Sequence, residues 1–218
     1  MKEDAMFRKY ILVLIILLFI GCSRTMIVTV PPAVDLISYG NIGLVSFSAE
    51  NARGQLHEMA TQRFLQVITQ FQRGAQLIEL GTLDEVLSQV NRTSLDQEAV
   101  KAIGEYFNVK GVFVGKIGVS DVKPQVSISA LIKSMGVRAS FTISMTSRLY
   151  STETGATLWT DSVRWEDSLA NLSLSEGGIP SFNVRDQDEA YGTLIENMIY
   201  ELTRDFRPTQ QRVRKPKY

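Results

Sequence analysis

The sequence predicts an α/β fold, a single three-layer-like domain in which helices flank a mixed β-sheet. Short apolar, β-branched runs alternate along the chain with segments whose apolar residues recur every three or four positions, which is the pattern of strands and helices in an α/β domain. A strictly alternating hairpin follows the third such run, and hairpin strands are antiparallel. The sheet should therefore be mixed, and the domain should cover residues 41–207.

The first half of the predicted domain alternates strand, helix and strand. Ile42–Ser48 is an apolar, partly β-branched run typical of a buried strand. A helix is expected over residues 55–72, because its apolar residues fall on one face: Leu56, Met59, Ala60, Phe64, Val67, Ile68 and Phe71. Arg73-Gly74 should end this helix, and residues 76–80 form a short second strand.

Two short helices with start signals come next. Glu85 follows Thr82 at the spacing of a capping box, in which each residue's side chain bonds the other's backbone N–H. Ser94 and Gln97 repeat that spacing before a second helix, which Asn108 should end. Residues 111–119 are typical of a third strand, and their three glycines predict close packing against one face.

A long hairpin is expected in the second half of the domain. Residues 141–149 alternate strictly between apolar and polar side chains, residues 152–155 suit a turn, and residues 156–165 form the return strand. This pattern predicts an antiparallel hairpin with one face in water. Residues 120–139, which precede it, leave three alternatives open: a loop, an edge hairpin or an inserted segment.

The end of the chain is expected to hold one more helix. A polar loop over residues 166–183 leads to an amphipathic pattern over residues 186–206, which Pro208 stops. Residues 208–218 should be a basic, disordered tail.

The first 21 residues predict the compartment. A short basic region precedes an unbroken apolar run over residues 10–20, and Gly21-Cys22 follows it. A basic start, a short apolar stretch and a small residue at the break describe an export signal. The run is shorter than the about 20 apolar residues that span a bilayer, so an uncleaved anchor is the less favoured alternative. Either Met1 or Met6 could start the chain.

Cys22 is the only cysteine, so it cannot form an internal disulfide. Leu18-Phe19-Ile20-Gly21-Cys22 resembles the lipobox of bacterial lipoproteins, where signal peptidase cuts before the cysteine and the thiol is acylated. Phe19 stands where that motif usually has leucine. We therefore expect residues 1–21 to be a signal peptide, Cys22 to carry lipid that holds the protein on a membrane, and residues 22–40 to be a tether.

The charge balance argues against a nucleic-acid partner. The signal segment carries three of the 23 basic residues and two of the 23 acidic ones. The remaining chain therefore has 20 basic and 21 acidic residues, and no global field favours a polyanion.

The sequence shows no catalytic or metal site. His57 is the only histidine, and Cys22, which should carry lipid, is the only cysteine. No further histidine or cysteine is therefore available to bind a metal together with His57. The acidic residues form no obvious pair, and the glycines of residues 111–118 lie within a strand rather than in a phosphate-binding loop. We expect a protein that is not an enzyme and needs no cofactor, with His57 a partly exposed helix residue.

Two tryptophans and a basic tail are the remaining candidates for binding. Trp159 and Trp165 are six residues apart on one predicted strand, so both should point to the same side. Either both pack in the core, or they form an aromatic surface for a partner or a membrane. The tail after Asp205 carries only basic charges and is either solvated or bound to an anionic surface.

Several segments together resemble the periplasmic α/β domain of the family that contains the curli secretion channel CsgG and the Pel-polysaccharide export lipoprotein PelC. The matching segments occur in the family's order: Ile42–Phe47, Leu77–Leu80, Leu83–Leu87, Phe107–Gly115 and Arg148–Trp159. This resemblance implies an anticodon-binding-domain-like fold and assembly into a ring at the outer membrane. Residues 166–183 are too polar to build the lipid-facing hairpin of the curli channel, so the PelC-like branch is the closer one.

These expectations combine into a functional hypothesis. The chain would be a non-enzymatic lipoprotein on the periplasmic face of the outer membrane, a homo-oligomeric scaffold that contacts export proteins of the outer membrane or periplasm and no nucleic acid. The alternative is a monomeric periplasmic adaptor that regulates an envelope enzyme. An exported hydrolase is the third possibility and would have to use His57 or an acidic pair.

Overall fold

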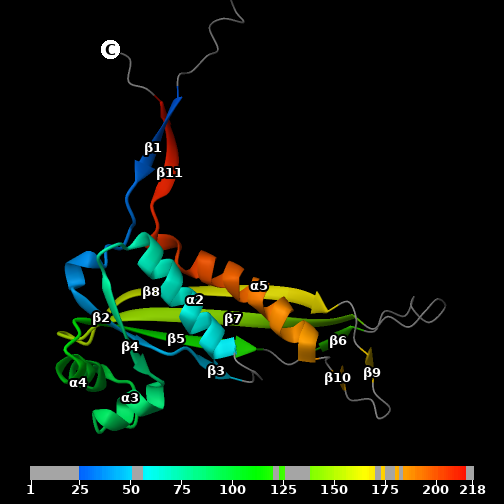
Figure 1. The fold of residues 1–218 in the computed structure, drawn as a ribbon, viewed down its shortest axis with the longest axis horizontal. Coiled ribbons are helices and arrows are strands. Elements are labelled where there is room, and N and C mark those ends of the chain that lie inside the picture. The colour runs from blue at the N-terminus through cyan, green and yellow to red at the C-terminus, as the bar shows by residue number, and fades with distance from the viewer. Residues whose placement is uncertain are drawn as a thin grey trace, which may run out of the picture. The chain divides into compact units, whose positions relative to one another are not determined.

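The computed structural model describes residues 25–50, 56–119, 123–125, 138–169, 173–174, 180–181 and 184–214. The chain divides into two compact units. The larger unit, Pro32–Arg207, contains the sheet and its helices, and the smaller unit combines chain from before Pro32 and after Arg207. Figure 1 labels the elements of both units.

The larger unit is built on a seven-stranded mixed sheet. Its strands are β2 (Asn41–Val45), β3 (Ser48–Glu50), β4 (Gln76–Gly81), β5 (Gly111–Val119), β6 (Lys123–Gln125), β7 (Arg138–Ser151) and β8 (Thr157–Leu169). β2 pairs in parallel with β4 and β5, whereas β7 pairs antiparallel with β5, β6 and β8. Because β5 and β8 pair with the same stretch of β7, they lie on its opposite edges. Within the described residues, β4 and β8 are thus edge strands, and the short strands β3 and β6 also have one neighbour each.

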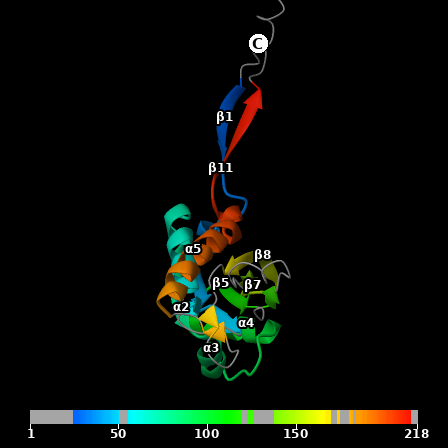
Figure 2. The same ribbon diagram turned by 90° about the vertical axis from the view of Figure 1, so that its right-hand side faces the viewer.

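Helices cover both faces of this sheet. α2 (Leu56–Phe71) and α5 (Val184–Leu202) lie side by side on one face, and α3 (Leu83–Gln89) and α4 (Gln97–Phe107) lie on the other (Figure 2). The side-chain alternation of β5 agrees, since Phe113 belongs to the cluster under α2 and α5 while Val112 belongs to the cluster under α3 and α4. The predicted three-layer α/β fold with a mixed sheet is confirmed.

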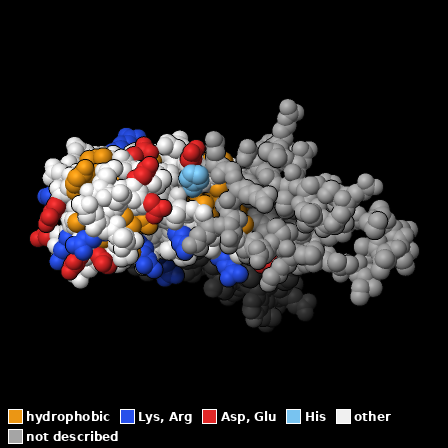
Figure 3. Space-filling view, turned by 90° about the horizontal axis from the view of Figure 1, so that it is seen from below, with side chains coloured by type: hydrophobic (Ala, Val, Ile, Leu, Met, Phe, Trp, Pro, Cys, Tyr) orange, Lys and Arg blue, Asp and Glu red, His pale blue; other side chains and the backbone are white. Residues whose placement is uncertain are grey.

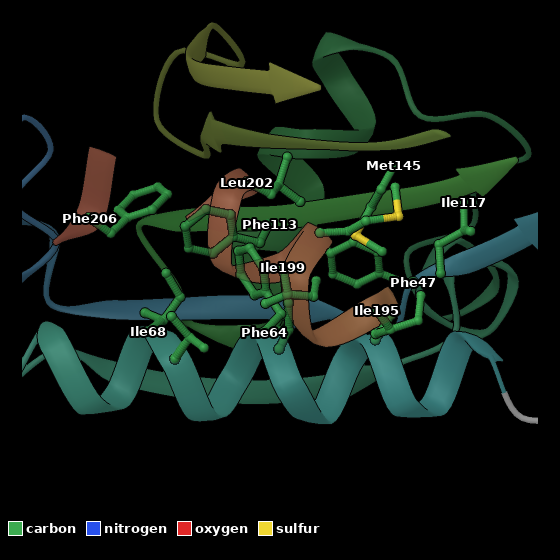
Figure 4. Packing of buried hydrophobic residues seen from close by; sticks show 14 of the residues in the cluster. Phe47, Phe64, Ile68, Phe113, Ile117, Met145, Ile195, Ile199, Leu202 and Phe206 are labelled. Atoms are coloured by element: carbon green, nitrogen blue, oxygen red, sulfur yellow. The ribbon is translucent and has the colours of Figure 1, made fainter. Parts of the chain in front are cut away.

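The core under α2 and α5 is organised around aromatic rings (Figure 4). The ring of Phe64 lies between Phe47 and Phe113, with centroid distances of 5.4 and 5.1 Å. Phe113 also meets Phe206 at 5.6 Å with an interplanar angle of 77°. Edge-to-face contacts of this kind stabilise the core beyond the area they bury. The Phe47 ring lies where a Cβ on Gly115 would be, which confirms close packing there.

The glycines of β5 do not all serve one face. Gly111 and Gly115 are an even number of residues apart and share a side of the strand, but Gly118 points to the other side, where Ser144 lies next to it. The prediction of one glycine-lined face is therefore right for two of the three positions.

The expected tether over residues 22–40 is wrong for most of its length. Thr25–Val30 forms strand β1, Ile37–Tyr39 forms the 3-10 helix η1, and Leu36 is fully buried in the core of the larger unit. The tail over residues 208–218 is likewise not simply disordered, because Thr209–Arg214 forms β11 and pairs antiparallel with β1 over six residue pairs. The two segments are almost the whole chain apart, so no local pattern announces their pairing.

Smaller departures concern the ends of elements. Asp96, not Ser94, caps α4: its carboxylate accepts a 2.8 Å hydrogen bond from the Ala99 backbone N–H. An aspartate directly before the first helical residue takes that place. The capping box at Thr82 and the left-handed Asn108 that ends α4 are both confirmed.

The polar stretch after Trp165 contains more structure than predicted. β8 runs on to Leu169, and the two-residue strands β9 (Ser173–Leu174) and β10 (Pro180–Ser181) pair with each other. The last helix is α5, which ends at Leu202 and is followed by the 3-10 helix η3 (Arg204–Phe206). Within residues 120–139, β6 and the start of β7 pair as strands, which excludes a simple loop there. The alternating residues 126–130 lie outside the described part of the chain.

Candidate interaction surface

The β7–β8 hairpin has one buried and one exposed face, as predicted. On the buried face, Ile143, Met145 and Leu149 are fully covered. On the opposite face the hydroxyl groups of Thr146 and Ser162 are 2.9 Å apart and bond to each other in solvent. The register pairs Leu149 with Trp159 and Ile143 with Trp165. Both tryptophans therefore lie on the face of the sheet that α2 and α5 cover. The prediction that they share a side is confirmed.

Trp159 is a core residue. Its ring is 7% exposed, with the Phe206 ring 4.6 Å away and the Phe113 ring 6.2 Å away, both edge-on. Its indole N–H donates a 3.1 Å hydrogen bond to the Asp205 carboxylate. A buried tryptophan whose N–H is satisfied in this way stabilises the fold. The interpretation of Trp159 as interface is wrong, since no partner can reach it.

Trp165 is accessible. Its side chain is 39% exposed although it lies on the same face as Trp159. The two residues are six positions apart, about 20 Å along a strand, so the Phe113 and Phe206 rings that cover Trp159 do not reach Trp165. Among the described residues, β8 pairs only with β7. Trp165 therefore stands on a strand that is a sheet edge within the described part of the chain, a combination that suits binding of a partner.

A shallow groove lies between α2 and α5. It has a volume of about 520 Å³ and is lined by Met59, Gln62, Arg63, Gln66, Gly192, Ile195 and Glu196. The Arg63 guanidinium pairs with the Glu196 carboxylate across it. The side chains of both are partly exposed, so solvent weakens their attraction. Only two apolar side chains line the groove, and an ion pair lies across it. Small-molecule sites are mostly apolar, so this groove is poorly suited to bind one.

His57 lies at the surface near the start of α2. Figure 3 shows the chain's single histidine, in pale blue, at the surface. Its side chain is 39% exposed, and its Nε2 is 3.9 Å from the carboxylate of the adjacent Glu58. This confirms the prediction of a partly exposed helix residue. No group of three or more potential metal ligands occurs among the described residues.

Comparison with known proteins gives distant structural similarities. Neither a protein-family model nor a curated protein matches the sequence. The PelC dodecamer from Paraburkholderia phytofirmans is similar to this chain with 10% identity and a TM-score of 0.42, over 84% of this chain and 97% of PelC. Lipoprotein GNA1162 from Neisseria meningitidis is similar with 15% identity and a TM-score of 0.41, over 75% and 98%. The LpoB C-terminal domain from Escherichia coli is similar with 10% identity and a TM-score of 0.34, over 58% and 82%.

PelC, to which the sequence already showed a resemblance, is thus among the similar structures. TM-scores below 0.5 and identities of 15% or less carry no functional conclusion, so the surface must be judged by its own residues.

The other predicted functional residue, Cys22, lies outside the described residues. The helices of the described part are all too short or too polar to cross a membrane. The lipid on Cys22 therefore stays a prediction from the sequence alone.

Sequence reasoning missed two buried polar residues of the larger unit. The sequence pattern singled out neither Gln72, at the end of a predicted helix, nor Arg207, in the basic tail. Gln72 is 3% exposed, and the Arg207 guanidinium lies 3.4 Å from the Tyr200 ring centroid and donates a 2.7 Å hydrogen bond to the Tyr200 carbonyl. Only the fold, which brings segments more than 30 residues apart around Gln72, shows that they are structural.

Proposed function

We propose that this protein is a non-enzymatic lipoprotein of the cell envelope, an oligomeric periplasmic scaffold in an outer-membrane export or assembly system. Acylated Cys22 would hold it on the periplasmic face of the outer membrane. The lipobox-like stretch Leu18–Cys22 supports the anchor, because two or more acyl chains retain a protein on a bilayer.

The described residues offer interaction surfaces and little chemistry. The charged group found next to His57 is Glu58, and no group of three or more potential metal ligands occurs in the described parts of the chain. A hydrolase would need a nucleophile with a base in hydrogen-bond reach. We therefore assign the protein to binding rather than catalysis.

Trp165 on the open edge of β8 is the observation that carries the proposal. Exposed tryptophans are rare on surfaces without partners and common at the centre of interfaces. The second open edge, β4, lies at the other side of the same sheet, and within the described residues it pairs only with β2. A contact that joins β8 of one copy to a different surface of the next is head-to-tail, and such contacts close into rings when the rotation allows.

A shared membrane would strengthen this assembly. Anchored copies are confined to one surface, which raises their effective concentration without any new contact. Even a modest contact at the β8 edge can then form a closed ring, although a stable one should bury at least about 1,000 Å² in total.

The test is the mass of the detergent-extracted lipoprotein, measured by light scattering. We expect a closed oligomer, and Trp165→Ala should weaken its assembly about 30-fold, as removal of an anchor residue does. Tyr106→Ala is the matched control, because Tyr106 is an exposed aromatic on α4, away from β8. A parent protein that stays monomeric at high concentration contradicts the scaffold.

A second function has one observation in its favour. Asp161, Arg164 and Glu166 lie along β8 near Trp165, and charges on an edge strand hinder pairing with a second copy. A monomeric adaptor that regulates an envelope enzyme would contact that enzyme, rather than a second copy of itself, through Trp165. The adaptor predicts a monomer in detergent whose cellular function is nevertheless lost in Trp165→Ala.

A further inference from the structure

We propose that the ribbon formed by β1 and β11 is a lipid-binding element, one face of which docks on the surface of a bilayer that contains anionic phospholipid. The inference deepens the proposed function and rests on its lipid anchor for the ribbon's position at a membrane. The binding chemistry itself comes from the ribbon's own residues.

The register sorts the ribbon's side chains into two faces. Residues directly opposite each other in an antiparallel pair point to the same side. Ile27 is opposite Arg212 and Thr25 is opposite Arg214, so these four share one face, together with Thr29 and Gln210. We name this the basic face.

The basic face combines charge with an exposed apolar side chain. Ile27 is 63% exposed, the highest value among the large apolar side chains given for the described residues. The two arginines beside it present fork-shaped donors that match phosphate oxygens. An apolar side chain that shares a face with two guanidinium groups suits a headgroup layer, where arginine binds phosphate and isoleucine enters the acyl boundary.

Charge is strongly divided between the two units of the mature chain. Residues 32–207 hold 15 basic and 21 acidic residues. The chain on either side of them, from Cys22 to Pro31 and from Pro208 to Tyr218, holds five basic residues and no acidic one: Arg24, Arg212, Arg214, Lys215 and Lys217. All uncompensated positive charge of the mature protein is thus in or next to the ribbon.

The predicted anchor puts this charge at the bilayer. Thr25, the first residue of β1, is three residues after Cys22. Three residues reach at most about 11 Å when fully extended. Arg214, which pairs with Thr25, is at the same end of the ribbon. Acylation of Cys22 therefore brings the Arg214 end of the basic face within about one Debye length of the headgroups.

A sheet of only two strands also benefits from a partner surface. Such ribbons are marginally stable in water at best, and all six residues of β11 are exposed. The ribbon of a second copy is a poor partner for the basic face, because Arg212 and Arg214 would then meet arginines, which carry the same charge. An anionic lipid surface fits both the charge and the exposed isoleucine.

Vesicle binding tests the proposal without using the lipid anchor. The mature chain with Cys22→Ser, unacylated, is sedimented with vesicles of phosphatidylcholine alone or with about 30% phosphatidylglycerol. We expect at least about tenfold tighter binding to the anionic vesicles, and loss of that difference at about 0.5 M salt, where charges are screened within a few ångströms. Equal binding to both vesicles, or to neither, overturns the proposal.

Two double variants locate the binding surface. Arg212→Glu with Arg214→Glu should abolish binding to anionic vesicles, and the milder Arg212→Gln with Arg214→Gln should weaken it about tenfold or more. Lys101→Glu with Lys110→Glu makes the same change of charge at exposed residues of the larger unit and should leave binding intact. If the control pair loses vesicle binding to the same extent, the net charge of the protein and not the ribbon determines its affinity for anionic lipid.

Light scattering on the same samples tests whether a second copy of the chain binds the basic face instead of lipid. If the parent self-associates through the ribbon and the arginine variants do not, a second copy covers the basic face and the lipid proposal is wrong. Failure of this experiment leaves acylation and the β8-edge oligomer untouched, because neither Cys22 nor Trp165 takes part in it.

Discussion

Gln72 holds together three segments of the larger unit. Its carboxamide oxygen accepts a 2.9 Å hydrogen bond from the Leu36 backbone N–H, and its nitrogen donates to the carbonyls of Val34 and Phe206 at 3.0 and 2.8 Å. One side chain thus satisfies backbone groups at both ends of the unit. Buried backbone groups that lose their partner cost the full desolvation penalty, so this residue should be among the least replaceable.

Gln72→Leu tests that role. Leucine has about the same size but leaves two buried backbone groups and one partly buried group without partners, and each buried group costs roughly 1–3 kcal/mol. We expect the free energy of unfolding to fall by at least about 2 kcal/mol in urea titration. Gln89→Leu at the exposed end of α3 is the control and should change it by under about 0.5 kcal/mol. Similar stabilities for the two variants would show that the Gln72 bonds contribute nothing.

At Cys22 the expected change is one of location. Cys22→Ser removes the only thiol that could be acylated, so the protein should leave the membrane fraction or keep its signal segment. Fractionation together with metabolic labelling by palmitate measures both outcomes. A Cys22→Ser protein that labels, migrates and fractionates like the parent contradicts the lipoprotein assignment.

Elements whose signals are local were predicted well. The Thr82–Glu85 spacing, the left-handed Asn108 and the hairpin alternation each involve residues a few positions apart, and each is present in the structure. Signals that depend on distant partners were missed. Nothing near Thr209 shows that it will pair with Val30, and nothing near Trp159 shows that Asp205 will accept its N–H.

The capping box of α3 should make a small part of the stability depend on pH. The Thr82 backbone N–H donates a 2.9 Å hydrogen bond to the Glu85 carboxylate, and this bond lowers the pKa of Glu85. A lowered pKa in the folded state stabilises the protein above the unfolded glutamate's pKa, and the effect is lost as pH falls through the folded value. Stability should therefore drop slightly more on acidification in the parent than in Glu85→Gln.

Paired urea titrations at about pH 7 and about pH 3 measure this difference. Glu105→Gln, an exposed glutamate on α4, serves as the control and should keep the parent's full acid dependence. Identical pH profiles for the parent and Glu85→Gln would mean that the side-chain half of the capping box adds nothing.

At the scale of the whole molecule, the chain consists of a negatively charged α/β unit and a positively charged ribbon. The fold class and most elements of residues 41–165 followed from periodicity. The start of the unit did not, because the apolar residues around Leu36 follow neither a helix nor a strand period, and the burial of Leu36 depends on contacts with distant segments. The sequence predicted one property of the two tryptophans, since the alternation places both on one face. It did not predict which of them is covered, because that depends on the packing of distant segments.

Two truncations test where the larger unit begins. A chain of residues 32–207 keeps Leu36 and every partner of Gln72 and contains the whole unit. A chain of residues 41–207, the boundary predicted from the sequence, loses a fully buried leucine, worth about 2–3 kcal/mol, and leaves two polar groups of Gln72 unpaired at roughly 1–3 kcal/mol each. Small domains have only about 5–15 kcal/mol in total. We therefore expect residues 32–207 to unfold cooperatively within about 1 kcal/mol of the mature chain. The shorter chain should lose at least about 4 kcal/mol in urea or fail to fold. If the two truncations are equally stable, residues 32–40 are a tether after all, and the contacts of Leu36 and Gln72 do not stabilise the protein.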